Sequence, residues 1–206
     1  KHRIDKTWQP KTNEGSLHRH FDIDSVNMSE GEWLILARTK LMLKEIEDSL
    51  YRKGLYYETR HKRSYEKDIQ EAATDWEHLR QGQLLSYKQI EKIYGYMSPE
   101  HRDKTLMYGM TKGSFYTLES LQSNFGLKTN KVWYEALDDA GSRRIEYLRK
   151  MRKNGEQLNK KPRIELSTIH AAKGGESQNV VLLTDLTKTT METYERNPDD
   201  ENRLFY

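Results

Sequence analysis

Cysteine is absent from this sequence, and so is any long run of apolar residues. Without cysteine the chain can form no disulfide framework and no thiolate site, and a metal would depend on scattered histidines and carboxylates. We therefore expect no metal site and an intracellular, cytoplasmic protein. The longest apolar stretches, Trp33–Ala37 and Val180–Leu183, are far too short to cross a bilayer, so no membrane partner is expected.

The composition is polar for a folded protein, with 33% charged and 34% hydrophobic residues, although 4 Trp and 13 Tyr supply large side chains for a core. A net charge of +3 is too small to indicate a partner by itself. Between Arg143 and Arg163, however, nine Lys or Arg stand against two Glu. This run fits either a solvated helix face or a nucleic-acid contact, and Tyr147 within it would suit stacking on a base. A second basic group comprises Arg52, Lys53, Arg60, Lys62 and Arg63.

The first part of the sequence has an α/β pattern. Trp33–Ala37 is typical of a strand that is covered on both faces. A helix is expected at Lys40–Lys53, where apolar residues recur at helical spacing, and Gly54 is well placed to end it. Two further strands are predicted, one from Leu17, Phe21 and Ile23 and one at Leu55–Glu58.

The middle, from roughly residue 60 to 160, is predicted to be helical and contains no convincing strand. An apolar stripe from Ile69 to Leu79 stops at Gly82. Ser86 and Gln89 form a capping box, and Ser98-Pro99 should start another helix. Further helices are expected at Leu118–Phe125, Val132–Ala140 and Ser142–Lys153.

Strand patterns return at Ile164–Thr168 and Asn179–Leu183, with a loop or short helix between them. Because α/β patterns bracket a helical middle, the simplest fold class is an α/β parallel-sheet domain interrupted by an inserted all-helical subdomain. The expected boundaries are 1–60 and 161–206 for the sheet domain and 61–160 for the insertion. Both late strands should then lie in one mainly parallel sheet with Trp33–Ala37.

The most informative stretch is IELSTIHAAKGGESQNVVLLTDL, from Ile164 to Leu186. It resembles helicase motif V of the UvrD-type superfamily 1 DNA helicases, in which Thr-x-His-x-x-Lys-Gly-x-Glu stands between two strands. Gly175 departs from the Leu that is usual in that family. The matching residues are Thr168, His170, Lys173, Gly174 and Glu176.

A loop that leaves the carboxyl end of a parallel strand is where open α/β sheets bind ligands. Thr168 and His170 can donate hydrogen bonds to the phosphates of a single strand, and Glu176 can accept one from a ribose hydroxyl. The resemblance implies DNA binding by the first pair and nucleotide binding by Lys173, Gly174 and Glu176. The plainer alternative is a surface turn with an ordinary histidine. The phosphate-loop pattern G-x-x-x-x-G-K-[ST] occurs nowhere in the sequence.

Two other segments resemble the same family. In EWLILARTKLMLKEIE, Arg38, Thr39 and Lys40 lie between a strand and a helix, where positive charge and free N–H groups suit a phosphate. Lys40 replaces the usual Asn, and Arg38 could instead simply cap the sheet edge. ENRLFY resembles the opening of motif VI and includes Arg203, but the sequence ends before that motif's Thr-Arg. We therefore interpret the chain as truncated within motif VI.

The resemblance implies a RecA-like domain from an ATP-dependent 3′-to-5′ DNA helicase or translocase of a compact, viral type, in which case it would act in the host cytoplasm. The partners implied are single-stranded DNA and the missing first RecA-like domain of the same polypeptide. The complete enzyme would use ATP and Mg²⁺, whereas no catalytic residue and no bound cofactor are expected in this chain alone. The alternative is a motor-inactive nucleic-acid-binding or recruitment module with a helicase-like fold. An upstream phosphate loop in the parent reading frame would discriminate between them.

Overall fold

The computed structural model describes residues 14–173, 175–186 and 188–196 and shows a mixed α/β protein. Its main sheet has four strands, in the spatial order β2-β5-β1-β6. Every neighbouring pair in this sheet is parallel, which confirms that the two late strands share a sheet with the first one. The strands are β1 (Trp33–Ala37), β2 (Tyr57–Thr59), β5 (Ile164–Thr168) and β6 (Asn179–Leu182).

Helix α1 (Lys40–Lys53) covers one face of this sheet, as the apolar spacing predicts. Thr39 caps its start by accepting a hydrogen bond from the Met42 N–H. Gly54 ends it in the left-handed conformation, with φ +71°. The core between helix and sheet contains Met28, Ile35, Ala37, Leu43, Ile46, Leu50, Leu55, Tyr57, Ile164 and Leu166.

The opposite face of the sheet is more open. Successive strand residues point to opposite faces, so Leu34 and Leu36 of β1 share this face with Val180 and Leu182, their partners on β6. Val180 and Leu182 are 54% and 37% exposed. Within the described residues, this part of the sheet therefore has apolar side chains in contact with solvent.

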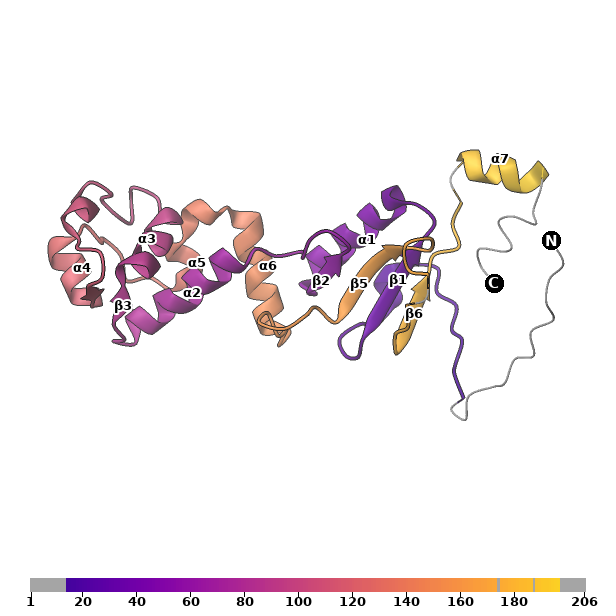
Figure 1. Cartoon of the computed structure of the whole chain (residues 1–206), viewed down its shortest axis with the longest axis horizontal. Helices are drawn as coiled ribbons and strands as arrows, with labels where there is room; N and C mark the ends of the chain where they lie inside the picture. The colour runs from indigo at the N-terminus through magenta and orange to yellow at the C-terminus, as the bar shows by residue number, and fades with distance from the viewer. Residues whose placement is uncertain (1–13, 174, 187, 197–206) are drawn as a thin grey trace.

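Between β2 and β5 the chain forms a second, mainly helical region with its own hydrophobic core, which Figure 1 shows extending away from the sheet. Trp76, Leu79, Ile93 and Leu148 are fully buried there. The elements are α2 (Lys67–Arg80), α3 (Tyr87–Gly95), α4 (Leu118–Asn124), α5 (Trp133–Ala136) and α6 (Ser142–Lys153), with 3-10 turns η2 (Leu106–Gly109) and η3 (Asp138–Ala140).

Local signals in this region are confirmed in part. The N–H of Ser86 donates to Oε1 of Gln89 at 3.0 Å, as the capping box predicts. The helix expected from Ser98-Pro99 is wrong, because only a single turn forms before Arg102 pairs with Leu127 in an isolated antiparallel bridge. Two short strands, β3 (Leu85–Ser86) and β4 (Phe115–Tyr116), pair antiparallel. Two residues are too few to show alternation, so the sequence did not indicate these strands.

The strand predicted from Leu17, Phe21 and Ile23 is also wrong. Leu17 and Phe21 are almost fully exposed, and Ile23 begins a 3-10 turn, η1 (Ile23–Ser25). Asp22 caps that turn by accepting a hydrogen bond from the Asp24 N–H at 2.9 Å. Local hydrogen bonding by aspartate therefore prevails over a weak alternation of apolar residues.

The two cores meet where the end of α1 contacts α6, a contact that we call the α1–α6 joint. Tyr147 of α6 is buried, and its ring stacks on Tyr51 of α1 with the ring centroids 3.9 Å apart. Its hydroxyl contacts the Leu55 carbonyl at 2.7 Å and Ser64 Oγ at 2.8 Å. The Asn154 amide donates to the Lys53 and Gly54 carbonyls at 2.8 and 3.0 Å. The joint is thus both apolar and hydrogen-bonded.

Candidate nucleic-acid and nucleotide site

The carboxyl ends of β1 and β5 lie side by side and bring together segments more than a hundred residues apart. Ala37 and Thr168 are register partners, and the Ile169 N–H donates to the Ala37 carbonyl at 3.0 Å. Directly beyond this pair, Nη1 of Arg38 lies 3.4 Å from Nδ1 of His170. Two residues that the sequence assigned to separate motifs therefore share one edge of the sheet.

The loop after β5 is a tight turn organised by Thr168. The Thr168 carbonyl accepts hydrogen bonds from the N–H groups of Ala171 and Ala172, both at 3.0 Å. The Gly175 N–H then donates to the Ala172 carbonyl at 2.8 Å. A Cβ added at Gly175 would lie 3.1 Å from that same oxygen. The tight turn therefore accounts for glycine where the helicase pattern has leucine.

The remaining predicted residues occupy different positions on this edge. Lys40 is exposed on the first turn of α1, and Thr39 is the cap of that helix. Lys173 and Glu176 are exposed on the loop after β5. Gly174 and Arg203 lie outside the described residues, so the structure says nothing of their placement.

Sequence reasoning missed the end of β2 as part of this edge. The Thr59 N–H donates to the Lys62 carbonyl at 2.8 Å, which closes a turn with Arg60, His61 and Lys62 exposed. Because β2 lies next to β5, Arg60 and Lys62 stand beside the turn that carries His170. The sequence displays the basic group but not the strand order that places it here.

The basic run Arg143–Arg163 mostly serves the fold. Arg152 stacks over the Trp133 ring, with its Cζ 4.9 Å from the ring centroid, and donates to Thr74 Oγ1 at 2.9 Å. Because Tyr147 is buried in the joint, the prediction that it stacks on a base is wrong. Several of the remaining cations form ion pairs with carboxylates: Arg143 with Asp48, Arg144 with Glu66, Lys150 with Glu146, Lys161 with Glu58 and Glu165, and Arg163 with Glu156.

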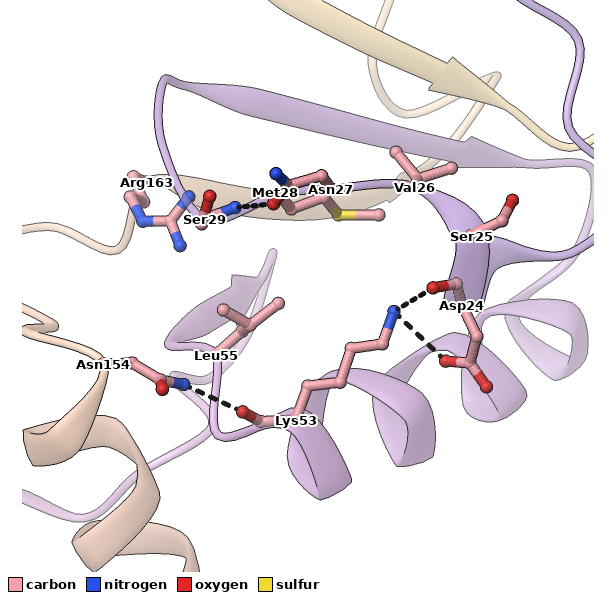
Figure 2. Close-up of a pocket in the computed structure, with 10 residues that line it drawn as sticks. All are labelled: Asp24, Ser25, Val26, Asn27, Met28, Ser29, Lys53, Leu55, Asn154 and Arg163. Atoms are coloured by element: carbon pink, nitrogen blue, oxygen red, sulfur yellow. Dashed lines mark hydrogen bonds and ion pairs between the residues drawn. The ribbon is translucent and has the colours of Figure 1, made fainter.

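A cavity of about 530 Å³ lies at the opposite, amino-terminal end of the strands (Figure 2). Its charged groups are all paired, since Lys53 lies 3.3 Å from the Asp24 carboxylate and Arg163 lies 2.8 Å from the Glu156 carboxylate. The Asn154 amide also donates to the Lys53 carbonyl at one side of the cavity, as Figure 2 shows. We therefore assign the candidate site to the carboxyl edge, where exposed cations and a glycine turn meet, rather than to this cavity.

Residues 14–173, 175–186 and 188–196 lack two features that would indicate other kinds of site. Nowhere in these ranges do three or more His, Asp or Glu side chains gather closely enough to hold a metal ion. Likewise, none of the helices within the same ranges has the length and apolar character to span a membrane.

The parallel sheet with a charged, glycine-containing turn at its carboxyl edge is compatible with a RecA-like fold. Residues 130–206 match the family model of the UvrD-like helicase C-terminal domain. This match supports a UvrD-type helicase C-terminal region and includes the turn after β5. A search of curated proteins and a search of solved structures each found no match.

Proposed function

We propose that this chain is the second RecA-like domain of an ATP-dependent 3′-to-5′ DNA helicase or translocase, contributing single-stranded DNA contacts and one wall of the ATP cleft. The observation that carries this proposal is the meeting of Arg38 and His170 across adjacent strand ends, beside the turn whose sequence resembles motif V. The activity would belong to the complete enzyme, which this proposal places in the cytoplasm.

The DNA side of the edge carries cationic and hydrogen-bonding side chains on three neighbouring strand ends. β2 leads into Arg60 and Lys62, β5 into His170, and β1 into Arg38 and Lys40. Neighbouring strands lie about 4.8 Å apart, so these groups form a band on the scale of a few nucleotides. Phosphate contacts from such a band would position a single strand without reading its sequence. Thr168 would add a hydroxyl to the same band.

The nucleotide side would begin after the turn, at Lys173, Gly174 and Glu176. An exposed lysine can bind a phosphate and an exposed carboxylate can accept a hydrogen bond from a ribose hydroxyl, so these residues fit part of an ATP site. ATP supplies the phosphoryl transfer that drives such motors. The proposal assigns the Mg²⁺ ligands and the phosphate loop to the first RecA-like domain, the partner in the same polypeptide, because the phosphate-loop pattern occurs nowhere in this sequence.

We also propose that the helical region is a subdomain inserted into the sheet domain, with the boundaries 1–60, 61–160 and 161–206. Its separate hydrophobic core supports this division, because a domain is expected to bury its own apolar side chains. The parallel pairing of β2 with β5 requires a crossover, which this region supplies.

Two substitutions in the same loop test the assignment of roles. His170→Ala should weaken binding of a labelled single-stranded oligonucleotide by about 1 kcal/mol, the value of one modest hydrogen bond. Glu176→Ala should leave DNA affinity without nucleotide unchanged and, in the complete enzyme, raise the KM for ATP or lower turnover. Fluorescence anisotropy and steady-state ATPase assays measure these effects.

The opposite result would contradict the proposal. If Glu176→Ala abolishes nucleotide-free DNA binding in a folded protein while His170→Ala leaves it intact, the roles within the loop are wrong. If the wild-type chain binds no single-stranded DNA even at low salt, the DNA-binding function of this edge is wrong.

A further inference from the structure

The contact between Arg38 and His170 constrains where the proton of the imidazole ring lies. Nη1 of Arg38 is 3.4 Å from Nδ1 of His170. A guanidinium group has five N–H donors and no acceptor, whereas a neutral imidazole has one donor nitrogen and one acceptor nitrogen. In this contact Nδ1 must therefore be the acceptor, and the ring proton must lie on Nε2.

We propose that Arg38 is a positioning residue that holds His170 in the Nε2–H tautomer, so that the ring presents an N–H donor to a phosphate oxygen of bound DNA. The choice of DNA as the ligand rests on the proposed function, but the tautomer depends only on the contact between Arg38 and His170. In this arrangement Arg38 acts on DNA in two ways, through its own charge and through the orientation of a second donor.

The backbone holds the two side chains in register. The Ile169 N–H donates to the Ala37 carbonyl. This hydrogen bond fixes the backbone just before Arg38 and just before His170. The Thr168 carbonyl then closes the turn over Ala171 and Ala172, which keeps His170 at the tip of a constrained loop. Arg38 is half-buried and His170 is exposed. The guanidinium thus approaches Nδ1 from the protein side, and the ring remains accessible to a ligand.

The tautomer can be read directly from the ring ¹⁵N chemical shifts of the full chain at pH about 8.5, where histidine rings are neutral. His170→Gln identifies the signals of His170 by their loss. The wild type should show protonated Nε2 and unprotonated Nδ1. Arg38→Leu should give a mixture of tautomers, and Arg38→Glu should move the proton to Nδ1, because a carboxylate can only accept. Lys40→Leu, which removes a cation from the same edge, should leave the His170 shifts unchanged.

A second measurement links the tautomer to DNA affinity. Arg38→Leu should raise the Kd for single-stranded DNA by more than Lys40→Leu does. The additional increase should be about fivefold, because the His170 ring no longer holds its N–H donor at Nε2. The amide N–H of glutamine lies near the position of Nε2–H and needs no partner to fix it. In a His170→Gln background, the additional factor should therefore disappear, so that Arg38→Leu and Lys40→Leu cost the same.

The outcomes separate the inference from the function on which it rests. If the ¹⁵N shifts of His170 are the same in the wild type, Arg38→Leu and Arg38→Glu, the positioning role is wrong even when DNA binding is normal. If the shifts change as expected but the wild type does not bind single-stranded DNA, the contact stands and the proposed function fails. If Arg38→Leu still costs more DNA affinity than Lys40→Leu in the His170→Gln background, the link between the His170 tautomer and DNA affinity is wrong.

Discussion

At the scale of single residues, the α1–α6 joint depends on a position that has no side chain. Gly54 adopts a positive φ of +71°, and a Cβ added there would overlap the Cβ of Lys150 on α6. Gly155 has nearly the same φ, +73°, but a Cβ added there would meet nothing within 4 Å. Alanine substitutions at these two glycines therefore distinguish the free-energy cost of a left-handed backbone from the cost of a steric clash in the joint.

We expect Gly54→Ala to lower the free energy of unfolding by clearly more than Gly155→Ala. Both variants place an alanine in the left-handed region, at a cost of about 1–2 kcal/mol. Only Gly54→Ala adds overpacking against α6, typically about 1–3 kcal/mol more. Urea unfolding followed by circular dichroism measures the difference, and equal losses would show that the joint yields without cost.

Tyr147 gives a second prediction at this scale. Tyr147→Phe keeps the ring stacked on Tyr51 but leaves the Leu55 carbonyl and Ser64 without the buried hydroxyl. The free energy of unfolding should fall by about 1–3 kcal/mol. The exposed Tyr108 provides the control, since Tyr108→Phe should change little. Oligonucleotide affinity should be unchanged in both folded variants, because the Tyr147 side chain is buried in the joint.

At the scale of elements, η1 is fastened to α1 by Asp24. Its carboxylate accepts a hydrogen bond from Ser49 and lies 3.3 Å from Lys53 and 3.4 Å from Arg52. The Ser49 hydrogen bond, followed by the hydrogen bond and charge of Lys53, lowers the pKa of Asp24 below its usual value. The unfolded chain therefore holds this proton more tightly than the folded chain does.

A lowered carboxyl pKa contributes stability above the unfolded value, about 3.9, and this contribution is lost as the pH falls through the folded value. We therefore expect the free energy of unfolding to decrease as the pH falls below about 4, and we expect Asp24→Asn to flatten this part of the profile. The control is Glu45→Gln on the exposed face of α1, which removes a carboxylate that is not part of this contact and should leave the pH profile nearly unchanged. A profile that is identical in the wild type and Asp24→Asn would refute the role of this contact.

The turn after β2 gives a prediction for DNA binding. If Arg60 and Lys62 contact two phosphates, Arg60→Gln/Lys62→Gln should reduce the slope of log affinity against log salt by about 1.4, because each single-strand phosphate contact contributes about 0.7. The matched control is Lys104→Gln/Lys112→Gln, which removes the same charge from exposed positions in the helical region. Equal changes in slope for the two pairs would mean that only net charge matters.

The elements that the sequence predicts well are those with strong local signals. β1, α1, α6 and β5 have the predicted bounds, because dense apolar patterns and the cap signals around α1 mark them. The proximity of Arg38 and His170 could not be predicted from spacing alone. It depends on the spatial order β2-β5-β1-β6, which differs from the order along the chain. Tyr147 was misread because a basic helix face does not reveal which of its residues pack against α1.

At the scale of the whole molecule, the proposed function places the groups that hydrolyse ATP outside this sequence. No phosphate loop occurs in the chain, and the described residues contain no cluster that would hold Mg²⁺. We therefore expect the purified chain to hydrolyse no ATP, with or without single-stranded DNA. A coupled-enzyme assay can test this, with an unrelated DNA-stimulated ATPase as the positive control. Appreciable DNA-stimulated turnover would overturn the view that the catalytic groups lie elsewhere.

Helix α1 runs as a strut from the carboxyl edge of the sheet to the α1–α6 joint. Its first turn follows Arg38 and Thr39 at the sheet edge, and its last turn abuts α6. Fourteen residues at about 1.5 Å per residue make this strut about 21 Å long. We expect that a tilt of α1 at the sheet edge would displace the helical region, because the last turn of α1 packs on α6. The stacked rings of Tyr51 and Tyr147 lie at this contact, so they would carry such a displacement from one region to the other.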